Sequence, residues 1–296
     1  MAKFEIKDGV AIIPEGTTVI GRGAFQDCTS LKSITIPESV NEIESYAFDG
    51  CTSLKSITIC EGVVRIAHRA FRGCTFLQSI IIPASVTVLG NENEDEEGCF
   101  LFDGCTSLKN IVVADGNPVY DSREDCNAII KTKTNNLLYG CKSTIVPKSV
   151  KWIGAGAFEG CAPLKRIVIP KGVEGIGCVA FSSCSSLMSV TIPDSVTWIG
   201  PDAFAGCTSL KSITIPESVT EIKNSVFERC ISLESITLPK SITEIHAYAF
   251  NECSALSTIY VPAMKADYYK KRLPEKLHDK IVELAPEKKT KTEKEC

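Results

Sequence analysis

The stretch GCTSLKSITIPESVTEI, residues 206–222, decides the fold, because near-copies of it recur along the chain. Each copy follows a phenylalanine, and within two blocks of the sequence these phenylalanines are 23 residues apart. A fixed period of this length indicates that each copy is one coil of a solenoid, which cannot bury its apolar face without its neighbours. The phenylalanines of the series are Phe25, Phe48, Phe71, Phe102, Phe158, Phe181, Phe204, Phe227 and Phe250.

The repeated unit predicts one β-strand per coil. Its LxxIxI segment alternates Ile or Val with Ser or Thr, which is typical of a half-buried strand. A proline usually follows, such as Pro216, and it ends the strand because it has no N–H to donate. A second apolar pair, such as Val219 and Ile222, and an Ala–Phe pair complete the coil. We therefore predict a mainly β solenoid with one parallel strand per coil and with Phe rings stacked along its axis.

Departures from the period divide the chain into parts. The first coil is incomplete, and we expect Phe4 and Ile6 to cover the open end of its core. After Pro262 the pattern stops, helical spacing follows, and the last residues are charged and low in complexity. The predicted parts are a capping coil at 1–24, repeats at 25–262 with insertions at about 91–98 and 114–146, a short helical cap at 263–284 and a disordered tail at 285–296.

The second insertion has structure of its own. It contains AIIK (128–131) and NLLYG (136–140), two strand-like segments separated by a polar turn. This pattern predicts a β-hairpin or an elaborated coil. The segment Ser143–Pro147 then resembles the end of a repeat strand, so we expect it to restore the strand register.

Composition sets limits on function. Hydrophobic residues make up 44% of the 296 and charged residues 23%, as in a folded protein. The net charge of −4 predicts neither nucleic-acid nor anionic-membrane binding. No stretch is long and apolar enough to insert in a membrane, and the N-terminus lacks a signal-peptide core. As the sequence stands it predicts a cytoplasmic protein; a secreted or cell-surface location is the alternative if a leader was removed.

The cysteines follow the repeat. Nine of the 15 lie three residues after a repeat phenylalanine, which is a fixed position in the coil. Small buried cysteines are common in cores, so we predict reduced core thiols. Neighbouring coils lie ~5 Å apart, so distance alone would allow a disulfide between them. The nine are Cys28, Cys51, Cys74, Cys105, Cys161, Cys184, Cys207, Cys230 and Cys253.

Catalytic and cofactor signals are weak, and the sequence predicts a non-enzymatic protein without cofactors. The histidines His68, His246 and His278 lie in turns between strands or in the C-terminal part. Cysteines at the repeat spacing do not match zinc-ligand spacing, and no glycine loop precedes a helix as phosphate binding requires. The acidic residues between Glu92 and Glu97 could hold calcium, although the spacing matches no EF-hand and a solvated charge run is the simpler interpretation.

The pattern LxxIxIPxxVxxIxxxAFxxC closely resembles the BspA-like class of leucine-rich repeat proteins over about residues 10–262. The resemblance implies a right-handed solenoid with its parallel sheet on the concave face and an irregular convex side. It also implies non-catalytic protein binding, and some surface-exposed relatives are adhesins for matrix proteins such as fibronectin or fibrinogen. The chain differs from those relatives in showing no export signal and no anchoring domain.

One outward strand position gives the only site prediction. At five coils it holds Thr, whereas Ile81, Val112, Ile145 and Val168 occupy it near the two insertions. On the predicted concave sheet these four residues would lie side by side, and we call them the apolar stripe. It predicts either a partner-binding patch or a surface covered by an insertion. The neighbouring cations Lys109, Lys165 and Arg166 favour an acidic partner, although lysines along strand edges also serve solubility.

Three functions remain open from the sequence. The first is a protein-interaction scaffold that binds a partner protein through the concave sheet at the apolar stripe. The second is a secreted or surface adhesin, as the resemblance suggests. The third is a self-associating structural module, in which Cys296 on the tail could form an intermolecular disulfide.

Overall fold

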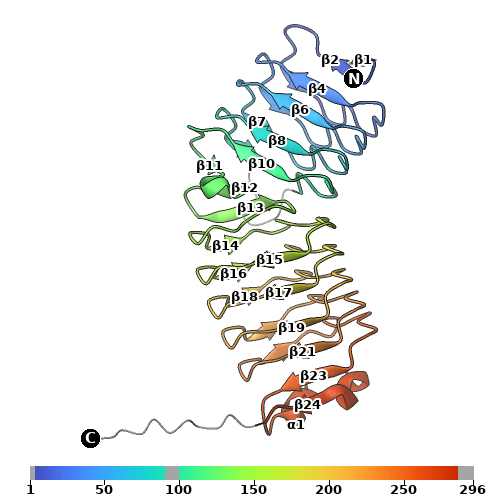
Figure 1. Cartoon of the computed structure of the whole chain (residues 1–296), viewed down its shortest axis with the longest axis vertical. Helices are drawn as coiled ribbons and strands as arrows, with labels where there is room; N and C mark the ends of the chain where they lie inside the picture. The colour runs from blue at the N-terminus through green and yellow to red at the C-terminus, as the bar shows by residue number, and fades with distance from the viewer. Residues whose placement is uncertain (1–3, 91–99, 286–296) are drawn as a thin grey trace, which may run out of the picture.

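The chain is a stack of coils along one long axis, with the N-terminal coil at one end and the C-terminal cap at the other (Figure 1). The computed structural model describes residues 4–90 and 100–285. The predicted acidic insertion at 91–98 lies outside the described residues, as do Cys296 and all but the first residue of the predicted tail. The solenoid predicted from the 23-residue period is confirmed.

The LxxIxI segments form a parallel ladder, one strand per coil, as predicted. Equivalent residues of neighbouring coils are opposed, for example Thr35 and Thr58. Ile and Val point inward and the residues between them point outward, and we call this outward side the strand face. The strands are β4 (Ser33–Ile36), β6 (Ser56–Ile59), β8 (Ser79–Ile82), β10 (Asn110–Val113), β15 (Arg166–Val168), β17 (Ser189–Thr191), β19 (Ser212–Thr214), β21 (Ser235–Thr237) and β23 (Thr258–Val261).

The structure also contains a second ladder, made of two-residue strands, which the repeat pattern did not predict. Each strand ends on the buried Ile or Leu of the second apolar pair. Its first residue points outward, except in the strand that begins with the buried Gly175. Pairing is again parallel, as between Glu221 and Glu244. The strands are β3 (Val19–Ile20), β5 (Glu42–Ile43), β7 (Arg65–Ile66), β9 (Val88–Leu89), β14 (Trp152–Ile153), β16 (Gly175–Ile176), β18 (Trp198–Ile199), β20 (Glu221–Ile222) and β22 (Glu244–Ile245).

Each end of the solenoid is covered by its own element. At the N-terminus, β1 (Glu5–Lys7) and β2 (Val10–Ile12) form a hairpin, β2 pairs with β4, and the Phe4 ring stacks on Phe25 at 4.9 Å. At the C-terminus, α1 (Ala266–Lys270) and the 3-10 helix η2 (Glu275–Lys280) precede β24 (Ile281–Glu283), which pairs with β23. Both ends of the main ladder therefore carry an extra strand that the repeat pattern does not contain.

The second insertion forms the predicted hairpin. It begins with β11 (Tyr120–Asp121) and the 3-10 helix η1 (Arg123–Asp125), and then β12 (Ala128–Lys131) and β13 (Asn136–Gly140) pair antiparallel. Strand β13 also pairs in parallel with β14, so the insertion supplies a strand to the second ladder.

The expected strand at Ser143–Pro147 is wrong, because residues 143–147 form no strand. The Thr144 hydroxyl donates to the Asn127 carbonyl and accepts from the Cys141 amide, and the Ile145 amide donates to the Cys126 carbonyl. These bonds hold the backbone against residues 126–127 instead of a neighbouring strand. Only the alternation of burial persists, since Val146 is buried and Ile145 is exposed.

The core consists of two apolar clusters that meet at the hairpin. Ile129 and Tyr139 belong to the N-terminal cluster, whereas Ala128, Ile130 and Leu137 belong to the C-terminal one. Strand β12 is therefore buried on both sides and acts as a partition. Successive side chains of a strand point to opposite faces. In β12 both faces meet an apolar surface, which explains the near-continuous hydrophobic run AIIK.

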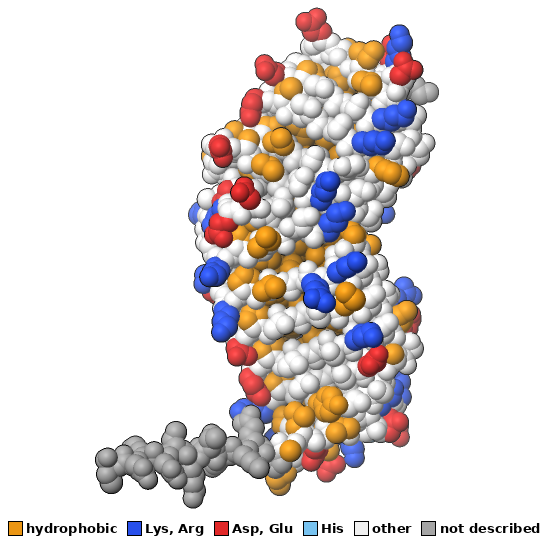
Figure 2. All heavy atoms as spheres, viewed as in Figure 1, with side chains coloured by type: hydrophobic (Ala, Val, Ile, Leu, Met, Phe, Trp, Pro, Cys, Tyr) orange, Lys and Arg blue, Asp and Glu red, His pale blue; other side chains and the backbone are white. Residues whose placement is uncertain are grey.

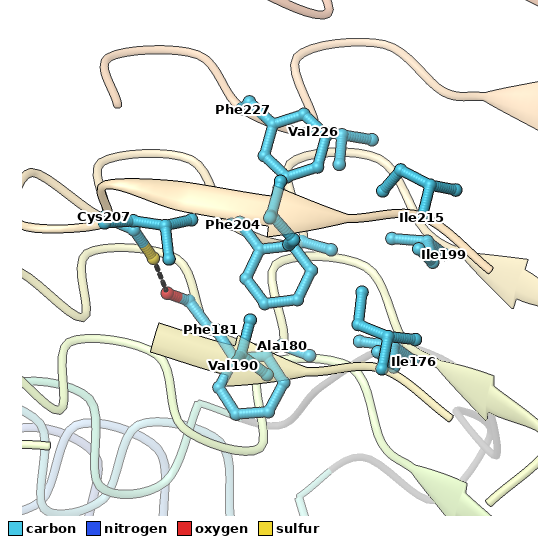
Figure 3. Close-up of a cluster of buried hydrophobic side chains, with 14 of the residues drawn as sticks. Ile176, Ala180, Phe181, Val190, Ile199, Phe204, Cys207, Ile215, Val226 and Phe227 are labelled. Carbon is cyan, nitrogen blue, oxygen red and sulfur yellow. Dashed lines mark hydrogen bonds between the residues drawn. The ribbon is translucent and has the colours of Figure 1, made fainter. Parts of the chain in front are cut away.

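The phenylalanines stack within each cluster, as predicted. Consecutive ring centroids lie 4.9–5.8 Å apart from Phe4 to Phe102 and 5.1–5.8 Å apart from Phe158 to Phe250. Figure 3 shows Phe181, Phe204 and Phe227 in this arrangement, with aliphatic side chains beside them. Between the two stacks, the Tyr139 ring meets Phe102 edge-on at 5.6 Å.

The cysteines at the repeat position are free thiols, as predicted, and most are buried. In most coils the thiol donates a hydrogen bond to the carbonyl of the repeat phenylalanine in the preceding coil, as Cys207 does to Phe181 at 3.2 Å (Figure 3). Burial raises the pKa of the Cys207 thiol to about 12. A protonated thiol is a poor nucleophile, so the buried Cys207 thiol contributes to packing.

Candidate partner-binding face

The apolar stripe is exposed. The exposed fractions are 59% for Ile81, 43% for Val112, 72% for Ile145 and 78% for Val168. Neither the hairpin nor any other described residue buries these side chains, which removes the interpretation that the second insertion covers them. Exposed β-branched side chains gathered on one face are uncommon on a protein that has no partner.

The structure divides the stripe into two parts. Ile81 and Val112 are directly opposed on β8 and β10, as expected. Hydrogen bonds then link the Val113 amide to Ser122 and the Ile145 amide to Cys126, so part of the insertion lies between Val112 and Ile145. The predicted continuous stripe is wrong in this respect, because the insertion adds backbone at the strand face as well as at the second ladder. Val168 follows on β15, opposite Thr191 of β17.

Unpaired cations accompany the stripe. The predicted residues Lys109, Lys165 and Arg166 are exposed, and Figure 2 shows Lys and Arg side chains in a column beside hydrophobic ones on this side of the molecule. Elsewhere cations meet carboxylates on neighbouring coils, as in the 2.9 Å pair of Lys151 and Glu174. Among residues 4–90 and 100–285, no such ion pair involves Lys109, Lys165 or Arg166.

Two further cations lie at the opposite end of the strands, and the sequence reasoning missed them. Lys148 and Lys171 directly follow the prolines at 147 and 170, are exposed, and have no ion pair within the described chain. In the flanking coils the same position is mostly acidic, with Glu38, Glu61, Asp115, Asp194 and Glu217. Comparing this one position between coils would have shown the change from acidic to basic residues. We call Lys109, Lys148, Lys165, Arg166 and Lys171 the central basic residues.

A shallow hollow of about 340 Å³ lies next to the stripe, lined by residues between Val113 and Asp125. Within it the Arg123 guanidinium meets the Asp121 carboxylate at 2.5 Å. Burial opposes ionisation of Asp121, but the hydrogen bonds and charge of Arg123 outweigh it and lower the pKa of that carboxyl. Arg123 also donates to Asn135 and Ser149, so this ion pair fastens the insertion to the repeats.

One group of side chains in the described chain could hold a metal ion together, namely Glu221, Glu244 and His246. His246 Nε2 lies 2.8 Å from a Glu221 oxygen and 3.6 Å from a Glu244 oxygen. The Lys223 ammonium contacts the other Glu221 oxygen at 2.5 Å. The hydrogen bond and charge of Lys223, with a smaller effect of His246, lower the pKa of the Glu221 carboxyl. Its charge is thus already compensated. The calcium prediction for residues 92–97 concerns a segment outside the described residues.

The other histidines have structural surroundings. His278 Nε2 bonds to the Leu273 carbonyl, and the His68 ring meets Phe100 edge-on at 5.7 Å. No helix in the described ranges is both long enough and apolar enough to span a bilayer.

Comparison with known proteins decides the family. The model of the BspA-type leucine-rich repeat region matches residues 9–117 and 130–264, in six copies. The chain belongs to this family. Its members and structural neighbours are repeat scaffolds, which supports a general function in protein interaction. No curated protein matches the chain.

Solved structures of bacterial proteins, leucine-rich repeat proteins among them, resemble this one. A leucine-rich cell surface protein from Faecalibacterium prausnitzii is 32% identical, with a TM-score of 0.70 over 83% of this chain and 64% of that one. A leucine-rich repeat protein from Eubacterium ventriosum is 26% identical, with a TM-score of 0.60 over 85% and 78%. The pneumococcal vaccine antigen PcpA is 22% identical, with a TM-score of 0.64 over 86% and 68%, and shares the fold. The chain thus spans less than two thirds of the F. prausnitzii protein.

Proposed function

We propose that this BspA-type solenoid binds a partner protein through its strand face, at the apolar stripe and the central basic residues. The observation that carries the proposal is the exposure of Ile145 and Val168 beside cations that have no ion pair in the described chain. The matching partner surface is apolar at its centre and acidic around it.

The apolar stripe and the central basic residues would contribute to binding in different ways. Fully burying one exposed Val or Ile side chain contributes about 1.5–3 kcal/mol. Covering the four partly exposed stripe residues would therefore be a main favourable contribution to binding, offset in part by the freedom lost on association. Interfacial charges mainly raise the association rate and exclude partners of the same sign. Central basic residues near the stripe therefore select acidic partners, while the apolar side chains hold the complex together.

The double substitution Val112→Lys and Val168→Lys tests the proposal. We expect it to reduce recovery of the partner from an extract of the source organism by at least about tenfold, because two charges would be desolvated at the interface. Thermal unfolding should stay nearly unchanged, since both side chains are exposed.

The matched control is Thr35→Lys with Thr214→Lys, which places the same charges at the same strand position in coils outside the stripe. Equal losses for both double variants would contradict the proposed site. Unfolding of the first variant would show instead that the stripe is core.

A second candidate is the cell-surface location that the sequence left as an alternative to the cytoplasm. It is favoured by the 32% identical F. prausnitzii chain, which is a cell surface protein. An adhesin function would require the strand face to be accessible outside the cell. Labelling intact cells with a membrane-impermeant amine reagent tests this, and protection of the protein in intact but not in lysed cells would exclude the adhesin.

A further inference from the structure

The two halves of the solenoid meet directly at one corner, although 56 residues separate Phe102 from Phe158. A Cβ placed on Gly160 would lie 2.7 Å from the Gly104 amide nitrogen and 2.4 Å from an Asp103 carboxylate oxygen. The coil that contains Phe102 and the coil that contains Phe158 are therefore neighbours at this corner. The hairpin at 128–140 separates these two coils only on the other sides of the solenoid.

A row of backbone hydrogen bonds changes at this junction. The Phe71 amide donates to the carbonyl of Leu101 in the next coil, and the Phe158 amide donates to the Ala180 carbonyl in the same way. Between them, the Ala157 carbonyl accepts from the Gly140 amide of the hairpin at 2.8 Å. The link between the halves at this point thus runs through the hairpin.

In the N-terminal half, the residues after the repeat phenylalanines form a row of polar side chains across the same corner. Gln26 donates to Asp49 at 3.2 Å, and Arg72 lies 3.8 Å from Asp49 and 3.5 Å from Asp103. Up to this point each carboxylate has a donor or a cation beside it. The next residue in the row is Glu159, so the junction places two carboxyl groups on adjacent coils.

Glu159 is poorly compensated. Its Oε2 atom is buried and accepts no hydrogen bond from the described residues. The charged groups that face it are Asp103, Arg69 and Arg72. Arg69 is engaged elsewhere, because its guanidinium lies over the Phe100 ring at 5.4 Å and donates to the Tyr46 hydroxyl.

Burial, and next the charge of Asp103, raise the pKa of Glu159 to about 7, while Arg69 and Arg72 lower it. Burial also raises the pKa of Asp103, against the effect of Arg72 and Arg69 and with a smaller contribution from Asp49. The direction follows from the geometry, since two adjacent, partly buried carboxyls resist carrying two charges.

We propose that Asp103 and Glu159 form a pH-sensitive joint between the two halves of the solenoid. When Glu159 is protonated, the pair packs without repulsion and the halves are held as one body. When Glu159 is ionised, repulsion and the cost of a buried charge loosen the junction. The apolar stripe has members on both sides of this joint, so pH would set how firmly the two parts of the strand face are held in register.

The sign of the pH dependence follows from linkage. A carboxyl group whose pKa is higher in the folded than in the unfolded state keeps its proton longer when the chain is folded. Its contribution to stability is complete below the unfolded value of 4.5 and is lost as the pH rises towards about 7. Stability should therefore fall between pH 4.5 and 8 by the part that Glu159 contributes.

The test compares the wild type with Glu159→Gln and with the control Glu228→Gln. Glu228 has the same position in its coil, but hydrogen bonds from Ser225 and Asn251 lower the pKa of its carboxyl group. Urea unfolding is measured from pH 4.5 to 8.5, together with hydrogen exchange of the Gly140 amide, corrected for intrinsic exchange rates. In the wild type we expect the folding equilibrium constant and the Gly140 protection to fall by about tenfold or more across this range relative to Glu159→Gln. Glu228→Gln should not reduce this fall.

Equal pH dependence of unfolding in the wild type and Glu159→Gln would overturn the proposal, as would equal pH dependence of Gly140 protection. If Glu159→Gln fails to fold, Asp103→Asn takes its place, because removing the facing charge should shift the transition to lower pH. No shift in Asp103→Asn would likewise overturn the joint.

Discussion

Replacing Phe204 with Ala is expected to lower the free energy of unfolding by about 3–5 kcal/mol. The ring is fully buried and stacks on Phe181 at 5.3 Å and on Phe227 at 5.8 Å. Its removal leaves a cavity between three coils, and the repeats can stabilise one another only through such neighbouring contacts. Urea unfolding followed by circular dichroism measures the loss.

The control for this substitution is Phe76→Ser, at a phenylalanine that is 55% exposed. It should change the free energy of unfolding by less than about 0.5 kcal/mol. A cost below about 1 kcal/mol for Phe204→Ala would mean that the aromatic stack does not hold the coils together.

Gly140→Ala is expected to cost about 3 kcal/mol of stability, at the upper end of the usual range for overpacking. A Cβ at this position would lie 2.2 Å and 2.5 Å from two carbons of the Phe158 ring. That ring is buried and stacks on Phe181 at 5.1 Å, so it cannot turn away freely. The Gly140 backbone cannot retreat either without lengthening its hydrogen bond to Ala157.

Gly21→Ala is the matched control, because a Cβ there would approach only a Glu44 side-chain oxygen, at 3.8 Å. It should be neutral within about 0.5 kcal/mol. Combining Gly140→Ala with Phe158→Leu should cost less than the sum of the two single changes, since the smaller side chain gives way. Equal stability of the Gly140 and Gly21 variants would show that the hairpin does not pack against the repeat core.

Much of the fold could be predicted because it is local and repeated. The alternation in LxxIxI fixes which side chains enter the core, and the 23-residue period aligns identical residues such as Thr35 and Thr58 in neighbouring coils. The Phe stack and the buried cysteines follow from the same register. The hairpin could also be predicted, since AIIK and NLLYG are strand-like and a polar turn separates them.

The second ladder could not be predicted with the same certainty. Its strands have two residues each, such as Trp152–Ile153, which is too short for a period of two to appear in the sequence. The pairing arises because the main ladder already holds the coils in register. Because the backbone is already ordered there, pairing these two-residue strands costs little additional conformational entropy.

The junction between the two halves of the solenoid could not be predicted from the sequence, for a different reason. Asp103 and Glu159 become neighbours only because the insertion leaves the corner of the coil, and no local pattern records that path. The same path places residues of the insertion between Val112 and Ile145 and divides the predicted stripe. The outward strand position of the stripe and its neighbouring cations could be predicted, whereas the sequence left open whether an insertion covers the stripe. Lys148 and Lys171 were missed because their basic character shows only when the position after the proline is compared between coils.

Photo-crosslinking from single positions tests the proposed binding face most directly. Benzoylphenylalanine is placed at Val112 or Val168 on the strand face, or at Glu42 or Glu244 as controls, which point outward from the second ladder. Each variant is irradiated in an extract of the source organism. We expect one common crosslinked product from Val112 and Val168 that weakens as salt is raised, and none from the control positions. Crosslinks from Glu42 and Glu244 with none from Val112 and Val168 would contradict binding through the strand face.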